Sequence, residues 1–233
     1  VGRDHWGVFP LRGKLLNVKE ATVQQLLKNE EINNLKQIMG LEQNKKYSSL
    51  NELRYGSIMI CTDADDDGFH IRGLLMNLFS TFWPELLKHK GFLRSLVTPV
   101  VKVSRRSESL SFYNLYDYQE WKTQTGGGVG WTTKYYKGLG TSTAAEAREY
   151  FRNLNKHNLK YNIDESSMDR LNLAFAKSEA DKRKVWVTQP IDKTAMGYEK
   201  GTESVSYSQF IDKELIQFSI ADVKRSIRTT LQD

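Results

Sequence analysis

The sequence predicts an α/β fold in which helices flank a mostly parallel β-sheet. Residues 57–62 (SIMICT) form a short apolar run with β-branched side chains, typical of a strand buried on both faces of a parallel sheet. Residues 69–91 then place apolar side chains three and four positions apart, as on the core-facing side of a helix. Strand and helix patterns continue to alternate to about residue 155, which completes the evidence for this class.

The elements before this strand are predicted to be a loop and one or two helices. Residues 2–14 carry glycines and a proline, which favour irregular structure. Residues 18–39 place apolar side chains at helical spacing, and Gly40 suits a helix stop. Pro84 should kink or restart the helix predicted within residues 69–91, because proline has no N–H to donate.

The elements after residue 91 are predicted from the same signals. Two strands are predicted around a polar turn, over residues 95–104 and 109–116. A flexible glycine loop follows over residues 125–130, then a strand that runs into a glycine turn over residues 131–141, and then a helix over residues 141–154. Thr143 and Glu146 in that helix have the spacing of a capping box. Short helices such as residues 178–187 follow, and then an apolar-periodic helix over residues 207–227.

These elements divide the chain into three predicted parts. They are an α/β domain over residues 1–155, a mainly helical connector over residues 156–205, and the start of a further domain over residues 206–233 that the chain end cuts short. The chain begins at Val1 rather than at a methionine, so we interpret it as an excerpt of a longer protein.

Composition restricts the function classes only mildly. Lysine and arginine outnumber aspartate and glutamate by 34 to 28, and the resulting net charge of +6 favours polyanionic partners such as nucleic acid. No apolar run approaches the ~20 residues that a membrane span needs. The single cysteine, Cys61, excludes an internal disulfide, and its place in the predicted strand suggests an inert, buried side chain.

Three aspartates alternate directly after the predicted strand, at Asp63, Asp65 and Asp67. With the following glycine they match the first half of an EF-hand calcium loop. However, the position that needs a bidentate glutamate is Leu74, and a strand rather than a helix precedes the loop. The sequence therefore argues against a calcium-sensing site.

Two other readings of these aspartates remain open on the residues alone. Carboxylates at the carboxyl end of a parallel strand can hold Mg²⁺ through one or two direct ligands, and a pair of such ions can support phosphoryl transfer. Alternatively, acidic residues in the first turn of a helix complement its dipole, which explains one or two aspartates better than three. The nearby His70 is predicted to be structural, because a site for a hard ion already has its carboxylates.

Three motifs occur in order along the chain: GRDHWGVFPLRGKLLNV at residues 2–18, TDADDDGFHIRGLL at 62–75, and KYYKGLGTSTAAEAREYF at 134–151. Together they resemble the Toprim region of the type IIA DNA topoisomerases, especially the eukaryotic enzymes. The resemblance continues through residues 180–187 and 210–227, so it covers nearly the whole chain.

The resemblance implies a Toprim fold, a helical connector and the beginning of a winged-helix domain. It also implies an ATP-hydrolysing, double-strand-passing topoisomerase that acts on double-stranded DNA as a homodimer. The implied location is the nucleus, with a mitochondrial form left open, and no membrane is an implied partner. Two Mg²⁺ ions per active site and ATP, the latter used by a domain outside this chain, are the implied cofactors.

The resemblance also assigns roles to residues. Asp63 would bridge both metal positions, Asp65 would bind metal, and Asp67 would have a lesser, supporting role. The tyrosine nucleophile and a metal-binding glutamate would lie outside residues 1–233, so we expect this chain alone not to cleave DNA. The implied DNA contacts, in chain order, are Arg12, Lys14, Asn17, Gln25, Lys134, Lys137, Arg183 and Lys184.

Two residues, Tyr55 and Arg228, are compared separately with the family's pattern. Tyr55 follows an arginine as the family's nucleophile does, but it precedes the acidic strand, so we reject it as the nucleophile. Arg228 stands where the family usually has proline, which leaves the local turn open. The alternatives to a topoisomerase are another Toprim enzyme, such as a primase or nuclease, and a non-catalytic DNA-binding module.

Overall fold

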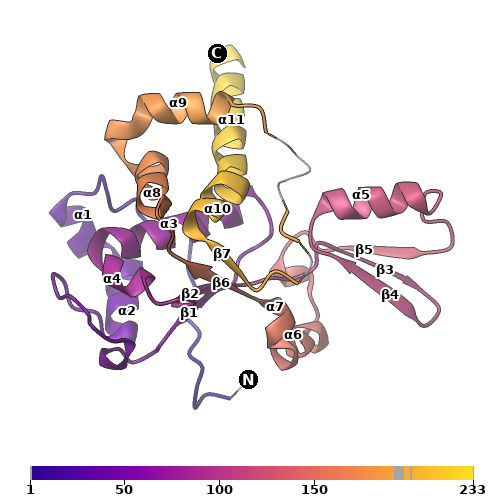
Figure 1. Cartoon of the computed structure of the whole chain (residues 1–233), viewed down its shortest axis with the longest axis horizontal. Helices are drawn as coiled ribbons and strands as arrows, with labels where there is room; N and C mark the ends of the chain where they lie inside the picture. Colours follow the sequence, from indigo (N-terminus) through magenta and orange to yellow (C-terminus); the bar gives the residue numbers. More distant parts are fainter. Residues whose placement is uncertain (1, 192–196, 200, 233) are drawn as a thin grey trace.

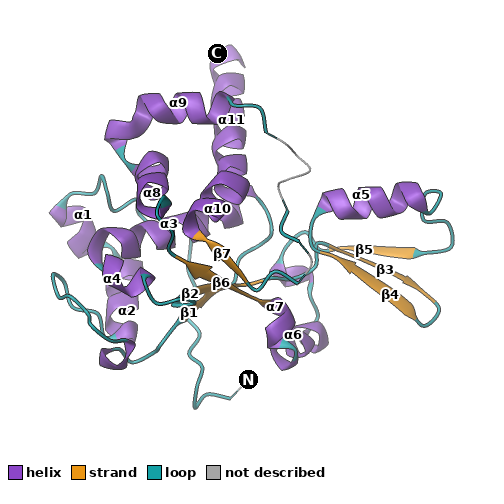
Figure 2. Cartoon of the chain, viewed as in Figure 1, coloured by secondary structure: helices purple, strands orange, loops and turns teal. Residues whose placement is uncertain are grey.

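The computed structural model describes residues 2–191, 197–199 and 201–232 (Figure 1). Its strands form two separate sheets, one of four strands and one of three, with helices packed around them (Figure 2). This confirms the predicted α/β class. In the described ranges, no helix combines the length and apolar character needed to cross a membrane.

The four-stranded sheet carries the acidic loop. Its order is β1-β2-β6-β7, with bounds Ile58–Ile60, Leu93–Leu96, Asn158–Asn162 and Ser204–Ser206. β1 pairs with β2 and β6 with β7 in parallel, whereas β2 and β6 are antiparallel, so the sheet is mixed. β6 and β7, which lie beyond residue 155, thus complete one sheet with β1 and β2 of the predicted first domain. The division at residues 155 and 205 stays a prediction.

The strand before the aspartates is less buried than its apolar sequence suggested. β1 lies at an edge of the sheet, and of its three residues only Ile60 is buried. The strand ends at Ile60, so Cys61 falls in the loop and is exposed. The prediction that Cys61 is buried is therefore wrong. Partial desolvation still raises the pKa of its thiol, and its inertness stays a prediction.

The helices of the first half follow the local signals closely. Residues 18–39 form α1 (Val23–Lys28) and α2 (Glu30–Met39), and Gly40 ends α2 with a φ of 75°, a conformation that favours glycine. After a short 3₁₀ turn (Leu50–Glu52) and β1 come α3 (Asp66–Phe82) and α4 (Pro84–Leu87). Pro84 restarts the helix as predicted, because it cannot donate the main-chain hydrogen bond that would continue α3.

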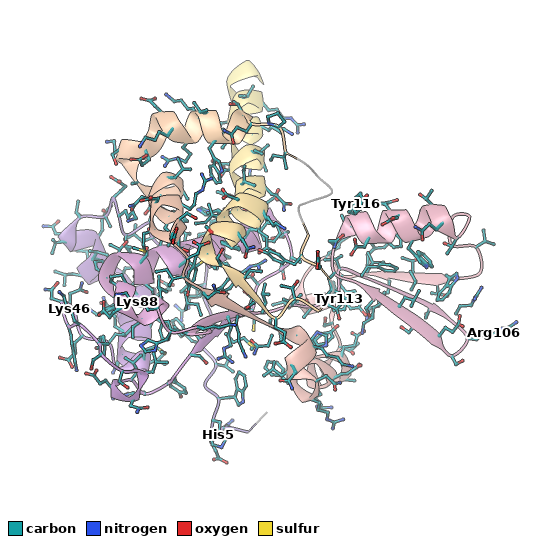
Figure 3. The ribbon with its side chains drawn as sticks, in the orientation of Figure 1. His5, Lys46, Lys88, Arg106, Tyr113 and Tyr116 are labelled. Carbon is teal, nitrogen blue, oxygen red and sulfur yellow. The ribbon has the colours of Figure 1, made fainter. Side chains whose placement is uncertain are left out.

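The three-stranded sheet belongs to a small unit with its own core. Its order is β4-β3-β5, with bounds Glu108–Phe112, Val101–Arg105 and Thr132–Tyr135, and α5 (Leu115–Gln124) covers it. Val101, Val103 and Tyr118 form the buried centre of this unit. Arg106, with a φ of 54°, lies at the tip of the β3–β4 hairpin, far from the main sheet (Figure 3).

Two sequence predictions fail in this region. The strand expected over residues 95–104 is two strands in different sheets, because the chain leaves β2 at Leu96 and passes Pro99 before β3 begins at Val101. The second strand, expected to reach residue 116, ends at Phe112. Asn114 then accepts a hydrogen bond from the Asp117 N–H and so caps α5. The sequence patterns did not predict this helix.

The remaining helices complete the fold. Another 3₁₀ turn (Leu139–Thr141) precedes α6 (Ala144–Arg152) and α7 (Leu154–His157). After β6 come α8 (Ser167–Phe175), a third 3₁₀ turn (Lys177–Glu179) and α9 (Ala180–Thr188). The helix predicted over residues 207–227 is α10 (Tyr207–Phe210), one π-helical turn (Ile211–Leu215) and α11 (Ile216–Gln232). Arg228 lies within α11, so the helix continues where a turn had been left open.

A buried ion pair joins α3 to the C-terminal helices. The Arg72 guanidinium, whose side chain is only 8% exposed, donates to the Glu214 carboxylate in the π-helical turn at 3.1 Å. The Tyr161 hydroxyl on β6 lies 3.4 Å from the same guanidinium. Since Arg72 also lies over the rings of Phe69 and Phe210, this one side chain connects the acidic helix, the sheet and the C-terminal segment.

Candidate metal centre and nucleic-acid interface

The acidic loop connects the end of β1 to the start of α3. Asp65 is the N-cap of α3, and its Oδ1 accepts a hydrogen bond of 2.8 Å from the Gly68 N–H. The helix-capping explanation of the acidic run therefore holds for Asp65. The Asp65 side chain is otherwise exposed, at the carboxyl end of a sheet strand where ligands gather in α/β folds.

Asp63 is held more closely than its neighbours. Its Oδ1 accepts a hydrogen bond of 2.7 Å from the Leu139 N–H in the glycine turn. Neither flanking glycine leaves room for a larger residue: a Cβ on Gly138 would lie 2.7 Å from Asp63 Oδ2, and one on Gly68 would lie 2.0 Å from the Asp63 carbonyl oxygen. The acidic loop and the glycine turn, far apart in sequence, thus form one unit around this carboxylate.

Asp67 and Asp66 have different surroundings. The Lys14 ammonium, on the N-terminal loop, donates to Asp67 at 2.8 Å, and this hydrogen bond lowers the pKa of Asp67. Both side chains of the pair are about half exposed, at 41% and 55%. Partial burial, together with the charges of Asp65 and Asp67, raises the pKa of Asp66. A cation near this loop would relieve the repulsion among these carboxylates.

The predicted aspartate triplet does not converge on a single point. Across residues 2–191, 197–199 and 201–232, no three histidine, cysteine, aspartate or glutamate side chains come together as a metal site. Asp63, Asp65 and Asp67 each have a separate partner, on Leu139, Gly68 and Lys14. Oxygen donors of this kind suit Mg²⁺, and an ion held by one or two of these carboxylates would keep water or phosphate as its other ligands.

His70 packs as a structural residue. Its ring stacks on Phe218 of α11 with centroids 3.8 Å apart and an angle of 15° between the planes. Burial lowers its pKa to about 4, so the ring is neutral at neutral pH. The Nδ1 atom is buried and has no hydrogen-bond partner among the residues that the structure describes. These contacts support the prediction that His70 positions the helix.

Of the eight predicted DNA-contact residues, four present a charge at the surface near the acidic loop and the glycine turn. Arg12, Lys14, Lys134 and Lys137 are all exposed. Lys14 also lies over the Phe218 ring, with its Nζ 4.7 Å from the ring centre. Lys134 forms an ion pair with Glu146, whose two carboxylate oxygens are each 3.1 Å from the Lys134 Nζ.

The other four are used within the chain to different degrees. The Asn17 amide donates to the Phe175 carbonyl oxygen at 3.0 Å and accepts from Asn77 at 2.9 Å, so both of its ends hold α8 and α3 in place. Arg183 donates to the Leu173 and Ala176 carbonyl oxygens at 2.7 and 2.9 Å and so caps the C-terminal end of α8. These contacts favour a structural role for Asn17 and Arg183.

Gln25 and Lys184 also have local partners. The Gln25 side chain completes a capping box with Thr22, accepting from the Thr22 N–H at 2.8 Å. The spacing of Thr22 and Gln25 is a signal that could have shown this from sequence. Lys184 pairs with Asp181 at 2.8 Å but remains 78% exposed, so its charge is accessible.

Comparisons with known proteins cover the whole of this arrangement. The family model described as "Toprim domain" matches residues 2–96, and the one described as "C-terminal associated domain of TOPRIM" matches residues 96–223. Their boundary at residue 96 coincides with the end of β2, where the chain leaves the main sheet for the three-stranded one.

Similar proteins and a similar solved structure agree with these matches. "DNA topoisomerase 2" of Drosophila melanogaster is 48% identical and "DNA topoisomerase 2-alpha" of Homo sapiens 46% identical, each over 97% of this chain. The chain spans only 17% and 16% of their lengths. The crystal structure of the Plasmodium falciparum topoisomerase II DNA-binding, cleavage and re-ligation domain superposes with a TM-score of 0.90 at 45% identity, over 96% of this chain and 30% of that one.

Proposed function

Because the chain belongs to the Toprim region of the eukaryotic-type type IIA DNA topoisomerases, we propose that its full-length protein is an ATP-dependent, double-strand-passing DNA topoisomerase. In this proposal the protein is a nuclear homodimer that acts on double-stranded DNA. The names of its relatives, which it matches at 46–48% identity, support this activity.

The observation that carries the proposal is the position of Asp63. Its carboxylate lies just beyond the end of a sheet strand, oriented by the Leu139 N–H and packed against Gly138, while Gly68 packs against the Asp63 carbonyl group. We assign Asp63 and Asp65 as the residues that would hold Mg²⁺, with Asp67 in a supporting role through Lys14. When bound there, Mg²⁺ would stabilise the charge that develops on the departing 3′ oxygen during cleavage, and a second ion would contact a backbone phosphate.

The surrounding basic side chains would bind the DNA backbone. Arg12, Lys14 and Lys137 have exposed charges on the two segments that flank the acidic loop. Contacts of this kind neutralise phosphates and set the register of the duplex without reading its sequence. Lys14, Lys134 and Lys184 each also pair with a carboxylate of the chain, so each would exchange that partner for a phosphate on binding DNA.

The test of the proposed function uses the full-length protein and supercoiled plasmid. With Mg²⁺ and ATP, we expect stepwise relaxation, and addition of detergent should trap DNA breaks with protein covalently attached to the 5′ ends. Removing Mg²⁺ with a chelator should abolish both. Breaks without attached protein would instead indicate a nuclease, and synthesis of short oligonucleotides would indicate a primase; either result rejects the topoisomerase proposal.

We also predict that this chain binds DNA weakly and without sequence preference. The affinity should fall steeply with salt, because each phosphate contact releases counterions. Replacing Lys14 or Lys137 by alanine should flatten the dependence of log affinity on log salt by about one unit each. Fluorescence anisotropy with a labelled duplex, measured over a range of salt concentrations, gives these slopes.

Lys46 provides a matched control for this measurement. It is an exposed lysine at the edge of the molecule opposite the three-stranded sheet (Figure 3). Lys46→Ala removes the same charge from the chain and should leave the salt slope unchanged. Equal slopes for all three variants would mean that Lys14 and Lys137 are ordinary surface charges.

A further inference from the structure

Glu146 joins segments on both sides of the glycine turn. Its carboxylate accepts hydrogen bonds from the Lys134 ammonium at 3.1 Å, from the Tyr136 hydroxyl, and from the Thr143 N–H at 2.8 Å. Lys134 belongs to β5, Tyr136 follows it, and Thr143 is the N-cap of α6. The capping box was predicted from the sequence, but the two bonds back to the strand side were not.

The charge of Glu146 is well maintained in this environment. Its side chain is only 18% exposed, and burial by itself would raise its pKa. The hydrogen bonds from Tyr136, Thr143 and Lys134 outweigh burial and lower the pKa to about 2. A second ammonium, that of Lys102 on β3, lies 3.9 Å away. The carboxylate therefore stays ionised at neutral pH and binds its donors strongly.

The segment that Glu146 closes is the turn over residues 137–142. Within it, the Thr141 and Ser142 N–H groups donate to the Gly138 and Leu139 carbonyl oxygens at 3.0 and 3.1 Å. Its outward N–H, on Leu139, donates to Asp63. The Glu146 carboxylate thus connects the two ends of the turn, while the Leu139 N–H in the middle of the turn orients the Asp63 carboxylate.

We propose that Glu146 is a positioning residue for the metal-binding carboxylate. By holding the two ends of the 137–142 turn together, it keeps the Leu139 N–H against Asp63 Oδ1 and so fixes the orientation in which Asp63 meets a divalent cation. This inference rests on the proposed function, because it assumes that Asp63 binds metal. Partners that orient a metal ligand typically change metal affinity by about 10- to 100-fold when they are removed.

The test compares three variants of the 233-residue chain. Glu146→Ala removes every side-chain bond from this position to the two ends of the turn, and Glu146→Gln keeps the capping box but loses the charge. Glu149→Ala removes an exposed carboxylate from the same helix as a matched control. Two quantities are measured. The first is the exchange rate of the Leu139 amide proton of this chain by NMR. The second is the affinity of the full-length protein with the same substitutions for Mn²⁺, used as a paramagnetic substitute for Mg²⁺, by electron paramagnetic resonance.

We expect Glu146→Ala to accelerate exchange at Leu139 and to weaken Mn²⁺ binding about tenfold. Glu146→Gln should lie between Glu146→Ala and the wild type, and Glu149→Ala should match the wild type in both measurements. If Glu146→Ala accelerates exchange throughout the chain, it has lost its fold, and Glu146→Gln then decides the matter.

Three results would overturn the inference. Unchanged exchange at Leu139 would mean that Glu146 does not hold the turn, and faster exchange with unchanged Mn²⁺ affinity would mean that the turn does not orient a metal ligand. Absence of Mn²⁺ binding in the wild-type full-length protein, which would carry the implied metal-binding glutamate, would reject the metal role in the proposed function itself. The first two results leave that role intact, so the two failures are distinguishable.

Discussion

Replacing Asp63 by asparagine should reduce DNA cleavage by the full-length enzyme about a hundredfold or more, which corresponds to several kcal/mol of transition-state stabilisation. Asparagine keeps the size of the side chain and an oxygen that can accept the Leu139 N–H, so the fold should survive. It removes one negative charge from the place where we propose that cations bind. The affinity for DNA should hold or increase, because a charge that repels phosphate has gone.

Asp67→Asn provides the comparison for this prediction. Asp67 is exposed and already paired with Lys14, so its loss should cost much less cleavage activity. Cleavage rate and DNA affinity should be measured for both variants across a Mg²⁺ titration. If Asp63→Asn cleaves at the wild-type rate, or if Asp67→Asn is the more damaging change, the assignment of metal roles within the acidic loop is wrong.

Replacing Arg72 by methionine should lower the free energy of unfolding by about 3 kcal/mol or more. Methionine fills part of the space but leaves the Glu214 carboxylate, only 15% exposed, without its cation. The Tyr161 hydroxyl loses the same partner. An uncompensated charge in a poorly solvated position is among the largest single-residue penalties in a folded protein. Urea unfolding of the chain, followed by circular dichroism, measures the change.

Two further variants test the cause of this loss. Arg170→Met breaks an exposed ion pair, Arg170–Asp212, of the same 3.1 Å length and should cost no more than about 1 kcal/mol. Adding Glu214→Leu to Arg72→Met removes the unpaired charge and should restore part of the lost stability. An Arg72→Met variant as stable as Arg170→Met would contradict the role assigned to the buried pair.

Local sequence signals determined most of the helices and the stops between them. The apolar spacing of residues 18–39 and 69–91, the glycine after α2 and the proline before α4 each act within a few positions of the backbone that they shape. The capping box of Thr143 and Glu146 formed as its spacing predicted. These predictions were right because helical periodicity and capping depend on neighbours three or four residues away.

The motifs of the sequence also determined its family. The acidic run, the N-terminal basic loop and the glycine turn indicated the Toprim region of a type IIA topoisomerase, and the comparisons confirm that membership. What these motifs left undetermined was how their side chains are used. Asn17 and Arg183 have the polar character of DNA contacts, yet both are engaged by main-chain carbonyl oxygens of residues 173–176.

Only the tertiary structure decided which distant segments meet. The hydrogen bond from Leu139 to Asp63, the ion pair between Arg72 and Glu214, and the pairing of β6 and β7 into the sheet of β1 all join residues far apart along the chain. The same packing separated residues 95–104 into two sheets and left Cys61 exposed. Contacts of this kind arise from the packing of whole elements around a shared core. Periodicity and capping within one segment carry no information about which surface that segment will meet.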